Sequence, residues 1–348
     1  MSDTSTGAES VAATARGATA ERHRRTARAL SWGELGERYG LVALLVAVTL
    51  VFAVSPETSA NFLSASNIRT LLGNQAVTAM LALAAVVPLV AGEFDVSIGA
   101  TLGLSSMVAA KLMTEQGLPP VAAAAAATAV GATVGAVVGI IVGYLRVSSF
   151  VISLGMATLL GGVVTWYAKG LTVVGIPQPV LDFGNKNALG VPRPVWLLVL
   201  TVLLLAYLLR YTIFGRTLLA IGVSRRAAEL VGINSNIRIA LAFLVSGTLA
   251  GAAGVVQLAR TGSASAQVGP GFTLAALAAA FLGATAITPG RFNVLGTLVG
   301  VVFVGVTVNG LTLMGAADWV EPVFNGTAVI AAVSLSAIVA RRKARLAA

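Results

Sequence analysis

Two carboxylates, Glu93 and Asp95, stand in the stretch VAGEFDVSIGATLG, which separates two long apolar segments. An acidic side chain in such surroundings is costly to ionise unless it is paired or hydrated, so it indicates a polar cavity, a helix terminus or a site of proton coupling. Asp95 can cap the helix that follows by accepting a hydrogen bond from the backbone N–H of residue 97 or 98. We expect this structural role, and proton coupling is the alternative.

A second polar stretch, SRRAAELVGIN at residues 224–234, predicts a short amphipathic helix. Its two faces are Ala227, Leu230 and Val231 on the apolar side and Arg225, Arg226 and Glu229 on the charged side. Ser224 is placed to cap its start and Gly232 to end it. Because about two turns of helix are unstable alone in water, something must hold this one. Lipid headgroups could hold it weakly, and a groove on a partner protein could hold it firmly.

Residue types that carry out catalysis or bind metals are scarce. The chain has no cysteine and one histidine, His23, which stands in the polar amino-terminal stretch. It contains no HExxH or GxSxG motif and no GxxxxGK[ST] phosphate-binding loop. We therefore predict no catalytic residue, no metal site and no cofactor, and in particular no ATP-hydrolysing site in this chain.

The segments around these stretches are apolar. Of the 348 residues 57% are hydrophobic and 10% are charged, and runs such as LVALLVAVTL and PVWLLVLTVLLLAYLL are typical of membrane spans. The alternation with period two that marks a membrane barrel is absent. We predict an all-α polytopic membrane protein with about ten transmembrane helices. The predicted spans are 41–55, 72–90, 96–113, 120–143, 150–168, 194–210, 238–259, 272–288, 293–314 and 321–340.

Basic residues outnumber acidic ones by 23 to 13, which gives a net charge of +10. With the amino terminus placed in the cytoplasm, most basic residues fall on the cytoplasmic side, a positive-inside pattern rather than a nucleic-acid-binding patch. Those expected outside are Arg69, Lys111, Lys169, Lys186, Arg193 and Arg260. The predicted organisation is a disordered basic cytoplasmic tail (1–40), a transmembrane domain (41–340) with a cytoplasmic loop (211–238), and a basic cytoplasmic tail (341–348).

Glycines recur at helical spacing in several predicted spans. Gly131, Gly135, Gly139 and Gly143 follow one another every four residues in GATVGAVVGIIVG, so they form one helix face without side chains. Shorter sets are Gly247, Gly251 and Gly254, and Gly296 and Gly300. Such faces let neighbouring helices approach closely, and we interpret them as packing faces. A pore lined by glycine is the alternative.

Uncharged polar residues inside the spans are candidates for lining a solute path. They are Asn74, Gln75, Ser153, Thr158, Gln257 and Asn309, and Phe150 at the start of its span could act as a gate. A hydrogen bond between helices is the alternative role for each of them.

A faint internal echo links GEFDV at 92–96 with GRFNV at 290–294. Each joins two predicted spans, and both are expected on the same side of the membrane. One hypothesis that follows is an ion pair between Glu93 and Arg291.

The stretch RRAAELVGIN resembles the coupling-loop motif of ABC importer permeases, which runs as an acidic residue, two alanines, three variable residues and a glycine. Ala227, Ala228 and Gly232 match this motif, and Arg226 stands where the acidic residue usually is.

The likeness extends along the chain. GEFDVSIGATLG, with Gly92, Asp95, Ser97 and Gly99, resembles the turn after the second span in permeases of the ribose-type (monosaccharide) ABC family. FVISLGMATLLGGV (150–163) and the segment 246–300, which contains GPGFTLAALAAAFLGAT and GRFNVLGTLVG, resemble the middle and carboxy-terminal parts of the same permeases. Together these stretches cover most of residues 60–340 in family order.

This resemblance implies an importer subunit in the cell (plasma or inner) membrane, with ten helices and a cytoplasmic coupling helix. Two such subunits, identical or different, would form a channel driven by cytoplasmic ABC ATPase subunits and supplied by an extracytoplasmic solute-binding protein. The solute would be a small polar molecule such as a monosaccharide or related polyol. The residues that would couple to the ATPase are Arg225, Arg226, Ala227, Ala228, Glu229 and Gly232.

Two departures from the family pattern concern the solute. Glu93 stands where sugar permeases usually have a second glycine, and Thr273 and Ala275 stand where acidic residues are common. The alternative function is a secondary transporter or facilitator, which would move solute without an ATPase and depend on Glu93 or Asp95. An intramembrane enzyme is a third class, but the spans contain no catalytic set.

Overall fold

The structure is a computed structural model that describes residues 32–347, with side-chain surroundings described for residues 38–334. His23 and most of the predicted amino-terminal tail lie outside these residues. The last part of that tail is helical from Trp32 onward and runs without a break into the first predicted span. The predicted carboxy-terminal tail is helical as far as Ala347.

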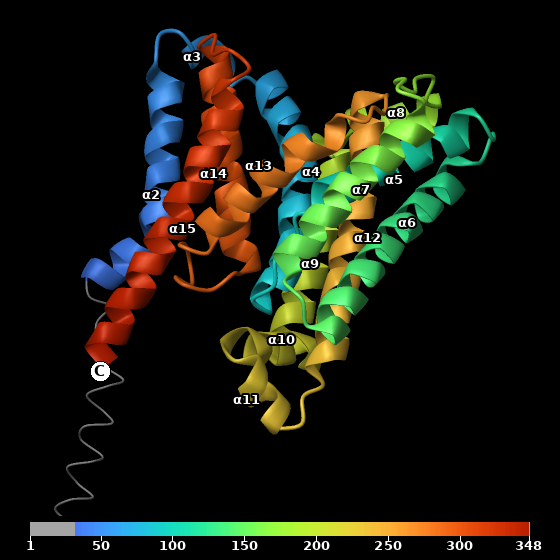
Figure 1. Cartoon of the computed structure of the whole chain (residues 1–348). Helices are drawn as coiled ribbons and strands as arrows, with labels where there is room; N and C mark the ends of the chain where they lie inside the picture. The colour runs from blue at the N-terminus through green and yellow to red at the C-terminus, as the bar shows by residue number, and fades with distance from the viewer. Residues whose placement is uncertain (1–31, 348) are drawn as a thin grey trace, which may run out of the picture.

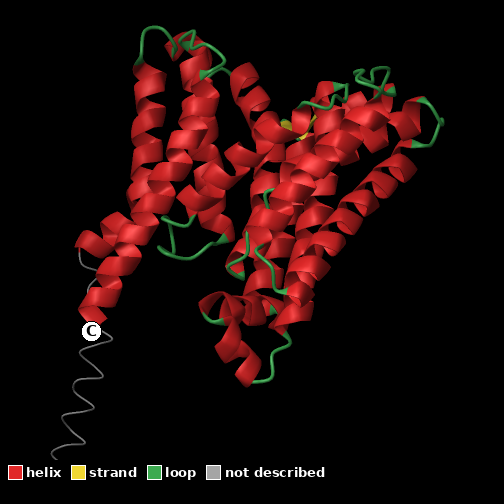
Figure 2. Ribbon diagram, viewed as in Figure 1, coloured by secondary structure: helices red, strands yellow, loops and turns green. Residues whose placement is uncertain are grey.

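Helices make up nearly all of the described chain (Figure 2). The elements are α2 (Trp32–Val54), α3 (Ser59–Phe62), α4 (Ala65–Val90), α5 (Ile98–Thr114), α6 (Pro120–Leu145), α7 (Ser149–Ala168), α8 (Gln178–Asn185), β1 (Asn187–Ala188), β2 (Val191–Pro192), α9 (Arg193–Tyr211), α10 (Ile213–Val223), α11 (Arg225–Leu230), α12 (Ser235–Thr261), α13 (Val268–Gly283), α14 (Val294–Leu313) and α15 (Val320–Ala347). The two short strands form an antiparallel hairpin in which Ala188 pairs with Val191.

Each predicted span overlaps one long helix, but the number of membrane crossings is not confirmed as ten. Six helices of the described residues are long and apolar enough to cross a bilayer: α4, α6, α7, α9, α12 and α14. Within residues 38–334, the apolar parts of α2, α5, α13 and α15 are shorter than 18 residues, and α2 and α15 extend beyond that range. The structure and composition together support an all-α polytopic membrane protein.

Helix α4 forms the centre of the bundle, because every residue from Ala76 to Val90 is buried. It packs against α9, α12, α13 and α14. Helices α7 and α9 lie at the periphery, since only 22% and 17% of their apolar windows are buried inside the chain. The large apolar side chains that α9 leaves exposed, such as Leu200 and Leu203, are those expected against lipid.

The predicted glycine faces are packing faces, as the sequence indicated. Helices α6 and α12 lie side by side (Figure 1). A Cβ atom on Gly131 would lie 2.5 Å from the carbonyl oxygen of Gly247, and one on Gly139 would lie 2.7 Å from that of Ala240. Gly254 likewise packs on the backbone of α5 at Leu102. Only glycine permits backbones to approach this closely.

The bundle has two distinct ends (Figure 1). Helices α3 and α8 lie at one end, called the α8 end below. Helices α10 and α11 lie at the other, called the α11 end, where the chain also turns between α4 and α5 and between α13 and α14. All the stretches that the sequence singled out for coupling therefore lie at one end of the molecule.

Candidate functional site

The predicted amphipathic helix is present as α11. The hydroxyl of Ser224 caps it by accepting a hydrogen bond from the backbone N–H of Ala227 at 3.2 Å. Gly232 follows its end with φ +86°, a conformation that side chains disfavour. The start and stop signals predicted from the sequence are confirmed.

The two predicted faces of α11 are also present, but the charged face contacts the bundle. Ala228 is buried, and Arg225 and Glu229 beside it are half-buried. Leu230 is 83% exposed and Val231 is 76% exposed. An apolar patch that a helix turns away from its own chain indicates a surface for a partner.

Arg225 anchors α11 to three other parts of the chain. Its guanidinium donates to the carbonyl oxygen of Gly143 at 2.8 Å, to Asn236 Oδ1 at 2.9 Å and to Ser235 Oγ at 3.1 Å. Its Nη1 atom lies 4.0 Å from Glu93 Oε1. The planar, multidentate guanidinium is suited to hold several acceptors at once, which the ammonium of lysine is not.

Glu229 is the second anchor of α11. It accepts hydrogen bonds from Ser235 Oγ and from Arg146 Nη2, the latter at 3.0 Å, and Arg225 Nε lies 3.5 Å away. The Ser235 hydrogen bond and the two positive charges lower the pKa of the Glu229 carboxyl, so it stays ionised at neutral pH. Arg226, between the anchors, is exposed.

The turn between α4 and α5, residues 91–97, is built around the buried carboxylate of Asp95. This group accepts hydrogen bonds from the backbone N–H of Ser97 at 3.0 Å, from Ser97 Oγ at 2.6 Å and from Ser246 Oγ at 3.0 Å. The predicted hydrogen bond from the backbone N–H of residue 97 is confirmed, but the predicted N-cap role is wrong, because Ser97 occupies the N-cap position of α5 and Asp95 lies two residues before it. Asp95 thus closes the turn and ties it to α12.

Glycines shape both sides of this turn. Gly92 has φ +80°, which lets the chain reverse after α4. Gly99, in the first turn of α5, faces α13, where an added Cβ would overlap Gly269 and Thr273. The residues of the family-like motif therefore determine the local backbone, and α13 packs closely on it.

Two serines of α7 hold the same turn. The backbone N–H of Phe94 donates to Ser149 Oγ and that of Val96 donates to Ser153 Oγ, both at 3.0 Å. Sequence reasoning considered Ser153 for the solute path and missed Ser149 and Ser246. The local sequence around an isolated serine in an apolar helix does not predict its hydrogen-bond partner.

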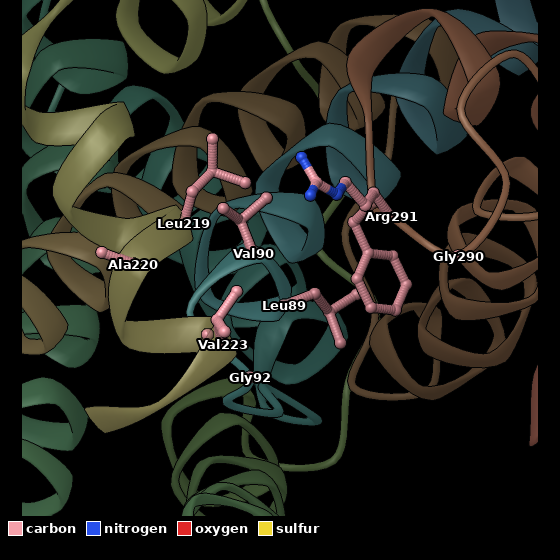
Figure 3. A pocket seen from close by; sticks show the side chains of 10 residues that line it. Leu89, Val90, Gly92, Leu219, Ala220, Val223, Gly290 and Arg291 are labelled. Carbon is pink, nitrogen blue, oxygen red and sulfur yellow. The ribbon is translucent and has the colours of Figure 1, made fainter. Parts of the chain in front are cut away.

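The hypothesis of a Glu93–Arg291 pair is wrong in this structure. Among the described residues, the cationic group within 4.0 Å of the Glu93 carboxylate is that of Arg225. Arg291 instead borders a cavity of about 480 Å³ at the α11 end. Figure 3 shows it across this cavity from Leu219 and Val223 of α10, with Val90 at the end of α4 between them.

The faint echo between the two turns has a structural counterpart. Gly290 has φ +86°, like Gly92 in the first turn. Asn293 caps α14 by accepting from the backbone N–H of Gly296 at 2.6 Å, and Asp95 accepts from the backbone N–H of Ser97, the residue before α5, at 3.0 Å. The phenylalanines of both turns contact Phe281: Phe94 stacks on it with ring centroids 5.9 Å apart, and Phe292 packs edge to face with centroids 5.4 Å apart.

The polar residues considered for the solute path lie on several helices, with Asn74 and Gln75 on α4 and Asn309 on α14. Asn309 exchanges hydrogen bonds with Asn67 at 2.9 and 3.0 Å, and Asn74 accepts from Arg260 at 2.5 Å. Gln75 packs against Gly305. The bonds of Asn309 and Asn74 join helices, which is the alternative role given to these two residues.

The candidates on α7 are more exposed. Phe150 is half exposed, and Thr158 is exposed and donates to the carbonyl oxygen of Leu154 in its own helix. Within residues 38–334, no group of three or more acidic, histidine or cysteine side chains could hold a metal ion.

Comparisons with known proteins agree with the resemblance. Residues 67–333 match the family described as branched-chain amino acid transport system / permease component. The chain is 35% identical over 304 residues to the ribose import permease protein of Escherichia coli (strain K12), covering 86% of this chain and 93% of that protein. It is 30% identical over 314 residues to the D-allose transport system permease protein of the same strain, covering 90% and 94%.

A further relative carries a different name. The chain is 28% identical over 309 residues to the autoinducer 2 import system permease protein of Photorhabdus luminescens, covering 86% of this chain and 92% of that protein. No solved structure matches.

Proposed function

The chain belongs to the family described as branched-chain amino acid transport system / permease component, and on this premise we propose that it forms the path by which a binding-protein-dependent ABC importer moves a monosaccharide or related polyol. It is a sugar-type ABC permease subunit, like the ribose and D-allose permeases that it resembles over most of its length. ATP hydrolysis is assigned to a partner subunit, and solute capture to an extracytoplasmic binding protein.

The observation that carries this proposal is the orientation of α11. Its charged residues anchor it to the bundle, and its apolar residues Leu230 and Val231 are directed away from the chain. A short helix held in this way can present a small apolar face to a groove on a soluble partner. We assign this groove to the ATPase subunit, so the α11 end faces the cytoplasm and both termini lie on that side.

The anchors refine the roles of the six coupling residues. Arg225, Ala228 and Glu229 contact the bundle, so we assign them to the position of the helix. Ala227 and Arg226 are exposed and belong to the surface offered to the ATPase. Gly232 ends the helix so that the chain can return into α12.

Reconstitution tests the function directly. The chain is placed in liposomes with its ATPase and binding protein, and uptake of labelled ribose, allose and a branched-chain amino acid is measured. We expect uptake of a sugar that requires ATP and both partners. Uptake by the chain alone would show that it is a secondary transporter or facilitator, and uptake of the amino acid only would overturn the sugar assignment.

Replacing Leu230 with serine should reduce retention of the ATPase subunit at least tenfold, because the apolar contact is lost while the helix anchors remain. The measurement is co-purification in mild detergent. Leu189→Ser is the matched control, since Leu189 is 92% exposed and lies in the hairpin at the opposite end of the bundle. Equal retention by both variants would show that α11 does not bind the ATPase through this face.

A further inference from the structure

We propose that Arg225 is a positioning residue that transmits movement of α11 to the turn 91–97, and not a residue that binds the ATPase. The inference rests on the proposed function, because it concerns how ATPase closure reaches the solute path. The coupling loop meets this turn at two points, one made by backbone and one by side chains.

The backbone contact is at Gly222, the penultimate residue of α10. A Cβ atom on Gly222 would overlap the carbonyl oxygen of Val90, and the Cα atom of Gly222 lies within 4 Å of the place of a Cβ on Gly92. Helix α10 therefore touches the exact segment where α4 ends and the turn begins, with no side chain between the two backbones.

The side-chain contact is made by Arg225, three residues further along the chain. Its guanidinium reaches Glu93 of the turn at 4.0 Å while it holds the end of α6 at Gly143 and the start of α12 at Asn236. Since α11 begins at Arg225, any displacement of this helix displaces the guanidinium and the groups bound to it.

The turn is tied in its own right to the helices of the bundle. Asp95 bonds to Ser246 of α12, and the backbone of Phe94 and Val96 bonds to α7. Phe94 stacks on Phe281 of α13, which also carries Phe292 of the second turn. A displacement at Glu93 is thereby passed to α5, α7, α12 and α13.

The cavity at the α11 end gives this movement room. It separates α10 from the second turn at Arg291, so α10 is packed tightly against the turn 91–97 and loosely against the turn 290–294. Closely packed interiors resist displacement, whereas an open volume of about 480 Å³ allows α10 to shift towards Arg291. Figure 3 shows the residues on both sides of this space.

The test measures solute transported per ATP hydrolysed by the reconstituted complex of this chain with its ATPase and binding protein. Arg225→Lys keeps the charge but cannot hold several acceptors at once. Glu229 and the buried Ala228 still hold α11 in both Arg225 variants, so we expect them to retain the ATPase and its hydrolysis within twofold. The transport-to-hydrolysis ratio should fall at least tenfold in Arg225→Ala and threefold in Arg225→Lys. Arg216→Ala is the control, because Arg216 is an exposed arginine of α10, and it should leave the ratio unchanged.

A purely structural role predicts a different result. In that case thermal stability and ATPase retention would fall together and the ratio would stay constant, which would overturn the proposal. Glu93→Gln tests the same contact from the side of the turn. Among the described residues, Arg225 is the cationic partner of Glu93, so this variant removes one ion pair, and it should lower the ratio about threefold. An unchanged transport-to-hydrolysis ratio in Glu93→Gln would show that movement of α11 does not reach the solute path through the turn 91–97.

These outcomes are separate from those of the proposed function. If the natural chain shows no ATP-dependent uptake with its partners, the function itself has failed. If the natural chain transports and the Arg225 variants transport equally well per ATP, only the assignment of Arg225 has failed.

Discussion

Replacement of Gly135 by valine should destabilise the folded chain by roughly 3 kcal/mol, because the added atoms must separate two packed helices. A Cβ atom on Gly135 would overlap the carbonyl oxygen of Phe243 and lie 3.0 Å from the Cα atom of Gly247. Both obstacles are backbone atoms of α12, so no rotation of a side chain can relieve the overlap. The helices would have to move apart along their whole contact.

Thermal unfolding of the purified chain in mild detergent measures this effect. Gly162→Val is the matched control, since Gly162 lies in α7, and apart from the backbone of its own helix no described atom lies within 4 Å of the place of its Cβ. We expect a large fall in the melting temperature for Gly135→Val and a small change for Gly162→Val. Valine is a better helix former than glycine, so similar falls in both variants would show that valine acts by a route other than the α6–α12 contact.

The fold could be predicted where a local sequence pattern is compatible with only one structure. Long apolar runs located each long helix, and glycines four residues apart identified the packing face of α6. Ser224 and Gly232 correctly marked the limits of α11, and Asp95 was correctly assigned to the backbone N–H of residue 97. In these cases the interacting groups are close in sequence or repeat along one helix.

Partners distant in sequence could not be predicted in the same way. The similarity of the sequences at 92–96 and 290–294 suggested an ion pair between Glu93 and Arg291, but in the structure Arg225 lies near Glu93 instead. The two faces of α11 were predicted, but not which of them contacts the bundle. Arg225 and Glu229 face inward because acceptors and donors at the ends of α6 and α12 surround them. Nothing in the local sequence shows which carbonyl or hydroxyl groups a helix will meet.

The number of membrane crossings shows a different limit. Helices α5 and α13 have 17 and 16 residues and are largely buried inside the chain. At 1.5 Å per residue such helices are shorter than a bilayer core of about 30 Å. Hydropathy alone cannot tell a full span from a shorter helix enclosed by its neighbours, since both are apolar.

Replacement of Asp95 by alanine should destabilise the chain by on the order of 3 kcal/mol, because the turn 91–97 loses the acceptor of three hydrogen bonds. Asp95 is 2% exposed, so water cannot replace the missing acceptor for Ser97 and Ser246. Loss of the turn also releases the link between α5 and α12. Transport should therefore fall with stability, as measured by thermal unfolding and by uptake in liposomes.

Asparagine at position 95 should restore most of the stability and most of the transport, because an asparagine already serves in the second turn. Asn293 occupies the corresponding place in the second turn and likewise accepts a hydrogen bond from a backbone N–H, that of Gly296 at the start of α14. An amide oxygen at position 95 can accept from Ser97, and its amide group can donate to the hydroxyl of Ser246. Asn cannot bind and release a proton at physiological pH, so Asp95→Asn separates the structural role from proton coupling. ATP-dependent uptake by Asp95→Asn near the natural rate would support the structural role of Asp95 in the turn 91–97. A stable Asp95→Asn chain without uptake would instead indicate that Asp95 carries protons, as in a secondary transporter.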